Sequence, residues 1–523
     1  MARRGTRLAP AVRATRVRLL LTALLLTVAT ACTTGTAVDI GGSGGTAVAA
    51  GPQLTAAIAA EPDQLDPHQS SAYATFEVLE NVFDTLVEPD ENLTMQPALA
   101  DSWTVTPDQR SWTFRLHPGV RWQDGTPFTA DDVVYSYRRI VDEELSNSYR
   151  LESVRTFTAV DPLTVRMDLT RPTPNLLENL GSYKGMAIVQ RRNVESGEIA
   201  RRPVGTGPFA VASYTPGDSV VLTRNPDYFR GAPPLASVRF TFVKESTVAY
   251  TNLTSGEAQW TDNIPPAKVQ ALVGRDDPVV RSVPSNDYWY FAFNSARKPF
   301  DDPRVRQAVA YAFDRGQVVD AAKFGGAQVN QTAIPPSSPW HVPYAPYTRD
   351  LPRARALLQE AGVPDLSFDF MVTTEYPETV QAAQVLADQL ADAGITLRIR
   401  VEDLATWLDN QSNGAFDSFA LGWLGNVDPD DFYYAQFRTG GSSNYQKYSN
   451  PAVDRLLDQA RQEVDRALRQ ELYAQVTRLI VDDASYVFLY NPDNVQGWAP
   501  EVRGYVPRQD KAVRFRTVSL EGS

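Results

Sequence analysis

The chain of 523 residues contains one cysteine, Cys32, and three histidines, His68, His117 and His341. A single cysteine cannot form an intramolecular disulfide. The histidines are scattered, no His-Glu-x-x-His motif is present, and no Gly-x-Ser-x-Gly nucleophile elbow follows a predicted strand. The sequence therefore predicts no metal site, no cofactor and no enzyme activity. A secreted hydrolase stays a distant alternative, because carboxylates that converge only in space leave no motif.

Long hydrophobic runs are also scarce, and the exception lies near the N-terminus. Six arginines precede a mainly apolar stretch, LLLTALLLTVATA, at residues 19–31. This stretch is shorter than the roughly 20 residues of a membrane-spanning helix, and a basic segment before it is typical of a secretion signal. Cys32 directly follows Ala29-Thr30-Ala31, which resembles a bacterial lipoprotein cleavage site, although Leu is usual where Ala29 stands.

We therefore expect residues 1–31 to be a lipoprotein signal peptide, Cys32 to carry lipid, and residues 32–51, rich in Gly, Ala and Thr, to form a flexible tether. Removing residues 1–31 would lower the net charge from −12 to −18. Such an acidic chain is a poor partner for nucleic acid. The expected location is extracytoplasmic, with the lipid on the outer face of the cell membrane.

The remaining composition is that of a globular protein, with 43% hydrophobic and 21% charged residues, and its length predicts two or more domains. Arginine supplies 43 of the 50 basic residues, which we attribute to codon bias. Apolar alternation and helical spacing predict an α/β protein, with a βαβ unit and a parallel strand pair at 366–401. The main predicted strands are 53–60, 112–116, 160–169, 238–243, 366–372, 395–401 and 486–490; the main predicted helices are 72–87 and 378–393. Helix caps are also predicted at Thr129, with Asp132 completing a capping box, and at Asp302, Asn450 and Asp465.

The most informative stretch is Phe416 to Pro451. An apolar strand ends at Gly422-Trp423-Leu424-Gly425, and polar groups and aromatic rings follow it. Apolar walls with a few convergent polar groups are typical of a small-molecule pocket. The competing interpretation is a strand, a turn and a helix capped by an Asp, with the aromatic side chains in the core.

Several segments of the chain resemble the dipeptide/oligopeptide-binding family of extracytoplasmic solute-binding proteins (family 5), which serve ABC importers. The resemblance is carried by FDSFALGWLGNVDPDDFYYAQF and YSNPAVDRLLDQAR, by residues 99–138, by PVGTGPF at 203–209 and by residues 285–313. It implies a two-lobed α/β fold of the periplasmic-binding-protein (Venus-flytrap) type, with an extra α+β domain inserted in the first lobe. The implied divisions are 52–86, 200–285 and 488–523 for the first lobe, 87–199 for the inserted domain and 286–487 for the second lobe.

The resemblance also implies how the protein works. A monomer would bind a peptide or another small molecule between its lobes, close by a hinge, and present the solute to ABC permease and ATPase subunits. Members of the family also carry oligosaccharides, opine-like compounds or nickel, so a non-peptide solute stays open. Nickel is not favoured, since no histidine lies between Asp350 and the C-terminus.

The expected ligand-binding residues follow from the same resemblance. They are Trp423, Asn426, Asp428, Tyr288, Tyr290, Tyr183 and Tyr149. Peptide-binding members place an Asp three residues after the tryptophan, where it pairs with the ammonium group of the peptide, but this chain has Asn426. We therefore expect peptides with a free amine to bind weakly and the ligand to be N-blocked, modified or not a peptide. The alternative is that Asp428 supplies the missing charge.

Overall fold

The computed structural model describes residues 49–425 and 427–522. The predicted signal peptide, the predicted lipidation site Cys32, most of the predicted tether, and Asn426 therefore lie outside the described residues. Ala49, near the end of the predicted tether, donates its backbone N–H to Thr223 Oγ1 at 2.8 Å. Within the described part of the chain, no helix is long and apolar enough to cross a membrane.

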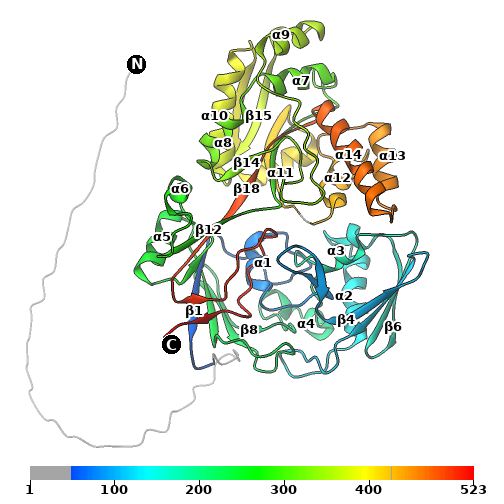
Figure 1. Ribbon diagram of the computed structural model, residues 1–523, viewed down its shortest axis with the longest axis vertical. Helices are drawn as coiled ribbons and strands as arrows, with labels where there is room; N and C mark the ends of the chain where they lie inside the picture. Colours follow the sequence, from blue (N-terminus) through cyan, green and yellow to red (C-terminus); the bar gives the residue numbers. More distant parts are fainter. Residues whose placement is uncertain (1–48, 426, 523) are drawn as a thin grey trace, which may run out of the picture. The chain divides into compact units, whose positions relative to one another are not determined.

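A mixed sheet of 12 strands runs through the protein, and its middle strand is β18 (Tyr486–Trp498). The strand order is β16-β15-β17-β13-β18-β11-β1-β10-β9-β8, and β12 and β14 also pair with β18. In Figure 1, β18 runs from the region of β14 to the region of β12 and β1. The first half of β18 pairs with β13 and β14, and this part of the sheet contains β13 (Tyr288–Phe293), β14 (Ala327–Val329), β15 (Ser367–Thr373), β16 (Thr396–Glu402) and β17 (Ser418–Trp423). The second half of β18 pairs with β11 and β12, and this part contains β1 (Gln53–Ile58), β8 (Phe209–Thr215), β9 (Ser219–Arg224), β10 (Ser237–Phe242), β11 (Trp260–Thr261) and β12 (Val279–Pro284).

Many of the helices that surround strands β13–β17 begin at a residue whose side chain caps the helix N-terminus. The predicted caps Asp302, Asn450 and Asp465 are confirmed, since each accepts a backbone N–H in the first turn of its helix. β15 and β16 pair in parallel on either side of α10, which confirms the predicted βαβ unit. The helices are α7 (Pro303–Tyr311), α8 (Arg315–Lys323), α9 (Leu351–Glu360), α10 (Pro377–Ala391), α11 (Leu404–Asn413), α12 (Pro429–Phe437), α13 (Pro451–Ala460) and α14 (Arg466–Asp483).

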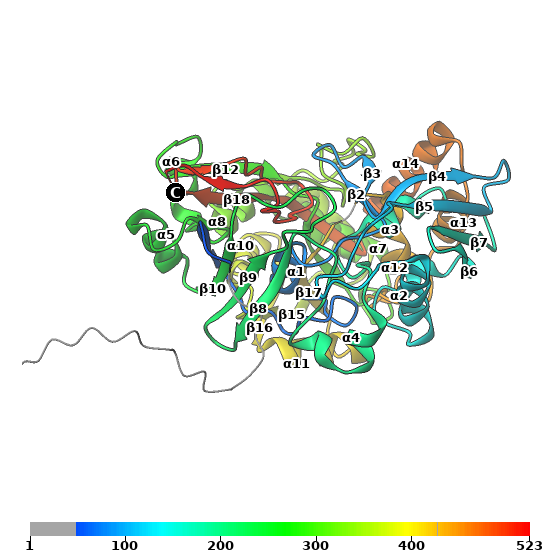
Figure 2. The same cartoon turned by 90° about the horizontal axis from the view of Figure 1, so that it is seen from below.

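A separate antiparallel sheet of four strands, in the order β4-β5-β7-β6, lies beside α2 (Figure 2). Helix α2 (Ala130–Asp142) begins with the predicted capping box, in which Thr129 N donates to Asp132 Oδ2 at 2.8 Å. The strands are β4 (Ala100–Val105), β5 (Ser111–Leu116), β6 (Val154–Asp161) and β7 (Thr164–Leu169).

The predicted helix 72–87 is shorter than expected, because α1 (Tyr73–Leu79) ends before β2 (Val87–Pro89) begins. The carbonyls of Asn81 and Val82 accept hydrogen bonds from Phe209 and Gly207, at 3.0 and 2.9 Å, instead of from a continuing helix. A Cβ on Gly205 would lie 1.9 Å from Val82 O, so the glycines of the PVGTGPF segment permit this close approach.

The buried apolar side chains form three large clusters. One contains residues of 54–83, 187–280 and 498–518, the second residues of 86–188, and the third residues of 288–490. We call these regions the first lobe, the inserted domain and the second lobe. Phe488, Leu489 and Tyr490, which the sequence assigned to the first lobe, pack in the second lobe because the first half of β18 pairs with β13. The other expected boundaries stay predictions.

Candidate functional site

A cavity of about 410 Å³ is lined by all three regions. This volume is within the range of roughly 300–1,000 Å³ found for small-molecule sites. Of the expected ligand-binding residues, Trp423 and Tyr149 line the cavity, and both side chains are partly exposed. The lining residues are Ser70, Ser71 and Phe76 of the first lobe, Ser146, Asn147, Tyr149, Arg150 and Lys184 of the inserted domain, and Leu421, Gly422, Trp423, Leu424, Asp430, Asp431, Tyr434, Ala435, Gln436, Ser442, Ser443 and Arg461 of the second lobe.

The two glycines around Trp423 allow the chain to approach its neighbours closely. A Cβ on Gly422 would lie 2.7 Å from the Trp289 ring, and a Cβ on Gly425 would lie 1.7 Å from the carbonyl oxygen of Asn286. Neither glycine has a positive φ, so a sharp turn is not the reason for them. The two glycines instead let the end of β17 pack closely against Trp289 of β13 and against Asn286, just before β13. This packing places Trp423 at the cavity wall.

Tyr288 and Tyr290 do not take the positions that the sequence predicted for them. Strand alternation does place both on one face of β13, but their exposed fractions are only 0% and 1%. Tyr288 stacks on Phe432 of α12 with ring centroids 5.9 Å apart, and Tyr290 stacks on Tyr486 at 3.9 Å. Both side chains belong to the core of the second lobe, so the prediction that they line the cavity is wrong.

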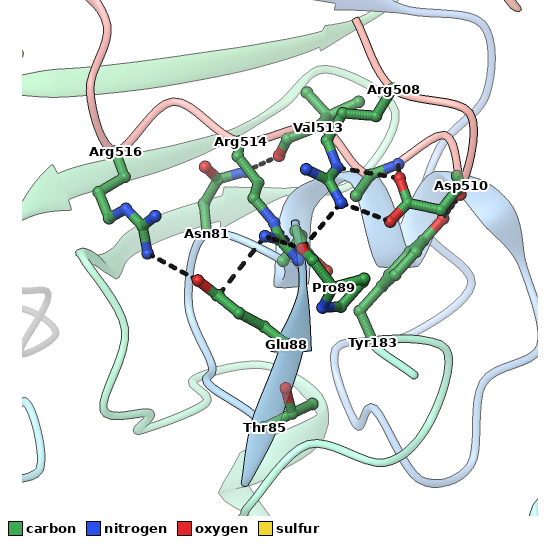
Figure 3. Close-up of polar contacts among 12 residues, drawn as sticks. Asn81, Thr85, Glu88, Pro89, Tyr183, Arg508, Asp510, Val513, Arg514 and Arg516 are labelled. Atoms are coloured by element: carbon green, nitrogen blue, oxygen red, sulfur yellow. Dashed lines mark hydrogen bonds and ion pairs between the residues drawn. The ribbon is translucent and has the colours of Figure 1, made fainter. Parts of the chain in front are cut away.

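Tyr183 is also buried, and it contacts residues 508–516, which we call the C-terminal segment. Its hydroxyl donates to the backbone oxygen of Asp510 at 2.7 Å, and its ring meets Phe76 edge-on at 6.0 Å. Figure 3 shows Tyr183 beside the arginine-rich C-terminal segment, in which Arg508 pairs with Asp510 at 2.8 Å. Tyr183 thus lies behind Phe76, outside the described lining, and its neighbour Lys184 lines the cavity instead.

Asp428 is a structural residue of the second lobe. Its two carboxylate oxygens accept from the Arg469 guanidinium at 2.6 and 2.7 Å, and its Oδ1 also accepts the backbone N–H of Asp430 at the start of α12. Its exposed fraction is 2%. The prediction that Asp428 binds ligand is therefore wrong, and so is the alternative in which it replaces the charge missing at Asn426.

The acids that do line the cavity, Asp430 and Asp431, were not among the expected ligand-binding residues. Asp430 Oδ2 accepts from Arg461 Nε at 3.0 Å, and Asp431 pairs with Arg150 at 3.3 Å. Burial raises the pKa of Asp430 to about 6, although the Arg461 charge opposes the increase. Burial likewise raises the pKa of Asp431, against the opposing charge of Arg150.

Ion pairs also connect the inserted domain with the second lobe. Arg150 of the inserted domain meets Asp431 of the second lobe, and Glu152 of the inserted domain accepts from Arg461 of the second lobe. These contacts hold the two regions together beside Asp430 and Asp431, at one part of the cavity wall. Among the described residues, three cations and two acids line the cavity.

Lys184 makes a further contact across the cavity. Its ammonium donates to the carbonyl oxygen of Gly425 at 3.0 Å, and the N–H of Gly425 donates to Asp287 Oδ1 at 3.1 Å. Asp287 Oδ2 in turn accepts from Lys511 Nζ at 3.1 Å. Gly425, in the turn after Trp423, is thus hydrogen-bonded both to Lys184 of the inserted domain and to Asp287, which lies between β12 and β13.

The sequence contained only partial signals for Lys184, Asp430 and Asp431. Lys184 lies in the segment SYKGM, and the two acids lie in DPDD, but neither motif tells which member faces a ligand. Which of these acids faces the cavity depends on two ion pairs. Arg469 of α14 pairs with Asp428 in the interior, and Arg150 of the inserted domain pairs with Asp431 at the cavity. Both neighbours are distant in sequence.

Two lobes and an inserted domain that close around a small-molecule cavity define a two-lobed solute-binding protein. Residues 94–445 match the family model described as "Bacterial extracellular solute-binding proteins, family 5 Middle". The match covers more than half of the chain, and the protein belongs to this family.

Individual relatives agree with this assignment. The chain is 28% identical to the glutathione-binding protein GsiB of Pectobacterium atrosepticum, over 87% of this chain and 92% of the relative. It is 26% identical to the periplasmic murein peptide-binding protein MppA of Escherichia coli, over 88% and 91%. Among solved structures, the ABC transporter-associated periplasmic binding protein DppA from Helicobacter pylori, in complex with the peptide STSA, superposes with a TM-score of 0.80 at 26% identity, over 90% of this chain and 98% of that chain.

Proposed function

We propose that this protein captures a peptide or peptide-like solute outside the cytoplasm and delivers it to the permease of an ABC importer. The observation that carries the proposal is the cavity, which residues of the first lobe, the inserted domain and the second lobe line together. The relatives named for glutathione and murein peptides, and the DppA structure with its bound peptide, support a ligand of this class.

The size of the cavity favours a short ligand. A volume of about 410 Å³ lies near the lower end of the roughly 300–1,000 Å³ found for small-molecule sites. This space suits a compound of about the size of a dipeptide or tripeptide. A longer ligand would have to open the ion pairs between Arg150 and Asp431 and between Glu152 and Arg461.

The cavity wall offers groups that suit a peptide backbone. The rings of Trp423 and Tyr434 provide apolar surface, and the Arg461 guanidinium lies 3.6 Å from the centroid of the Tyr434 ring. The side-chain oxygen of Gln436 is buried and has no hydrogen-bond partner among the described residues. We infer that it accepts an N–H from the ligand, since an unsatisfied buried acceptor is costly.

The charged side chains of the cavity wall determine how tightly a ligand with a free amino group can bind. Asp430 and Asp431 are each paired with an arginine, and position 426 is an uncharged Asn. A buried ammonium would therefore lack a free carboxylate in the described lining. Losing one member of such a pair costs about 2–5 kcal/mol, which is roughly 30-fold to several-thousand-fold in affinity. We therefore expect N-blocked peptides to bind more tightly than free-amine peptides.

Calorimetric titration of purified protein with matched di- and tripeptides, free or N-acetylated, tests both statements. Tighter binding of the acetylated forms by wild type, and a gain for the free amines in Asn426→Asp, is the expected result. Submicromolar binding of free dipeptides by wild type, with no gain in Asn426→Asp, would overturn the expectation about the amine. If no peptide binds, the ligand is a non-peptide solute, such as an oligosaccharide or opine-like compound, and the peptide proposal fails.

Attachment to the membrane completes the proposal. We propose that residues 1–31 direct export, that lipid on Cys32 holds the protein at the outer face of the membrane, and that residues 32–48 leave the binding lobes free to reach the permease. The support is the sequence pattern alone, because these residues lie outside the described part of the chain.

A further inference from the structure

The charges around the cavity do not balance. The described lining contains three cations, Arg150, Lys184 and Arg461, and two acids, Asp430 and Asp431. Arg150 and Arg461 each contact one of the acids. Glu152, which also contacts Arg461, is shared with Arg171 at 2.5 Å. One positive charge of the lining is left over, and it belongs to Lys184.

Lys184 is buried without a carboxylate partner among the described residues. Its exposed fraction is 7%, and its hydrogen-bond acceptor in the described part of the chain is an uncharged carbonyl, that of Gly425. The neighbouring acid Asp287 is paired with Lys511 at 3.1 Å. Burial lowers the pKa of the Lys184 ammonium, as expected for a cation removed from water, although Asp287 opposes the decrease.

The Lys184 ammonium also lies 5.6 Å from the centroid of the Tyr183 ring, which is a neutral partner. A buried cation that has no ionic partner at the wall of a binding site needs a counter-ion, because removal of a charge from water is costly unless the charge is paired. We propose that Lys184 binds a carboxylate of the solute, so that the ligand of this protein is an acid, held by its anionic group at the inserted domain. This inference rests on the proposed function and specifies the substrate class of the same cavity.

A single carboxylate fits this site better than a phosphate group. One surplus positive charge neutralises one carboxylate, whereas a phosphate carries about −1.5 to −2 at neutral pH. The compact ammonium of Lys184 can donate to Gly425 O and still has two N–H groups for a ligand oxygen.

The competing role for Lys184 is purely structural. Its bond to Gly425 O joins the inserted domain to the second lobe, and loss of this bond would weaken closure around any ligand. The two roles differ in selectivity. A closure bond affects acids and neutral ligands equally, whereas a carboxylate partner affects acids alone.

Matched peptide pairs separate these roles. The probes are N-acetylated di- and tripeptides of alanine, leucine and phenylalanine, each prepared as the free acid and as the C-terminal amide. Calorimetric titration is carried out on wild type, Lys184→Met and Lys184→Arg. Lys268→Met is the matched control, because Lys268 is exposed on the first lobe, outside the described lining.

Wild type and Lys268→Met are expected to bind acids at least about 30-fold more tightly than the amides. Lys184→Met should lose this ratio while retaining its affinity for the amides, and Lys184→Arg should keep part of the ratio. Equal binding of acids and amides by wild type, or an unchanged ratio in Lys184→Met, would overturn the inference and leave peptide binding intact. If neither these probes nor the free-amine peptides of the first titration bind, the proposed function is overturned, and the inference with it. Melting temperatures of the variants show whether each one is folded.

Discussion

At the scale of single residues, we expect replacement of Trp423 to affect ligand affinity and replacement of Trp407 to affect stability. Trp423 lines the cavity, whereas Trp407 of α11 is fully buried against Phe419. Trp423→Ala should abolish peptide binding and change the melting temperature little. Trp407→Ala should cost about 3–5 kcal/mol of stability, as a core replacement does.

Calorimetry and thermal unfolding of both variants give the comparison. A large loss of stability in Trp423→Ala, with peptide affinity unchanged, would show that Trp423 acts as a core residue.

Residue positions show where sequence reasoning succeeds and where it stops. The Gly-Trp pattern marks the end of β17, which is a local feature, and Trp423 lines the cavity there; its role in ligand binding stays a prediction. Alternation put Tyr288 and Tyr290 on one face of β13, but it could not tell that α12 and β18 cover this face. Which face of a strand meets the core depends on partners far away in sequence, and a single sequence does not display them.

At the scale of elements, Asp428 connects α12 with α14. It caps α12 and pairs with Arg469 in the interior, whereas Asp465 caps α14 at the surface. Asp465→Ala should cost about 1 kcal/mol, as loss of a cap does. Asp428→Ala should cost about 3–5 kcal/mol, because it leaves the Arg469 charge buried without its partner.

Denaturant unfolding of the two variants measures the difference. Equal losses of stability in the two variants would mean that Asp428 stabilises the fold only by capping α12. A loss confined to ligand affinity would restore Asp428 as a binding residue.

Elements with local signals were predicted best. The caps of α2, α7, α13 and α14 and the parallel pair β15–β16 were all recognised, since each depends on residues close in sequence. The strand predicted at 486–490 was recognised but is much longer in the structure, because its second half pairs with β11 and β12.

At the scale of the whole molecule, Glu88 joins the inserted domain to the C-terminal segment (Figure 3). Burial alone would raise its pKa, but the charges of Arg514, Arg230 and Arg516 outweigh burial and lower the pKa from 4.5 to about 2. Because the folded-state pKa is lowered, the stabilisation is complete above pH 4.5 and is lost as the pH falls toward 2. It amounts to about 3 kcal/mol at neutral pH.

Glu88→Gln should therefore lower the melting temperature at pH 7, and its difference from wild type should shrink between pH 4.5 and 2.5. Glu91→Gln, at an exposed site, should match wild type throughout. A difference between Glu88→Gln and wild type that does not change with pH would mean that the ionised carboxylate of Glu88 does not stabilise the fold.

Anchoring is a further property of the whole molecule. If Cys32 carries lipid, Cys32→Ala should move the protein from the membrane fraction to the soluble fraction or the medium, since each buried CH₂ of an acyl chain adds about 0.8 kcal/mol. Fractionation followed by immunoblotting measures the distribution. A variant that stays in the membrane fraction would contradict the lipoprotein prediction.

The position of β18 has a consequence for the order in which the protein is completed. Residues 486–498 supply a neighbour to β13 in the second lobe and to β11 and β12 in the first lobe. Until this late segment pairs, β13 in the second lobe and β11 and β12 in the first lobe lack the neighbour that β18 supplies, so each part of the sheet has an unpaired strand edge. Such edges invite association with other chains. Nascent protein therefore depends on being kept apart from its copies until its last strand arrives.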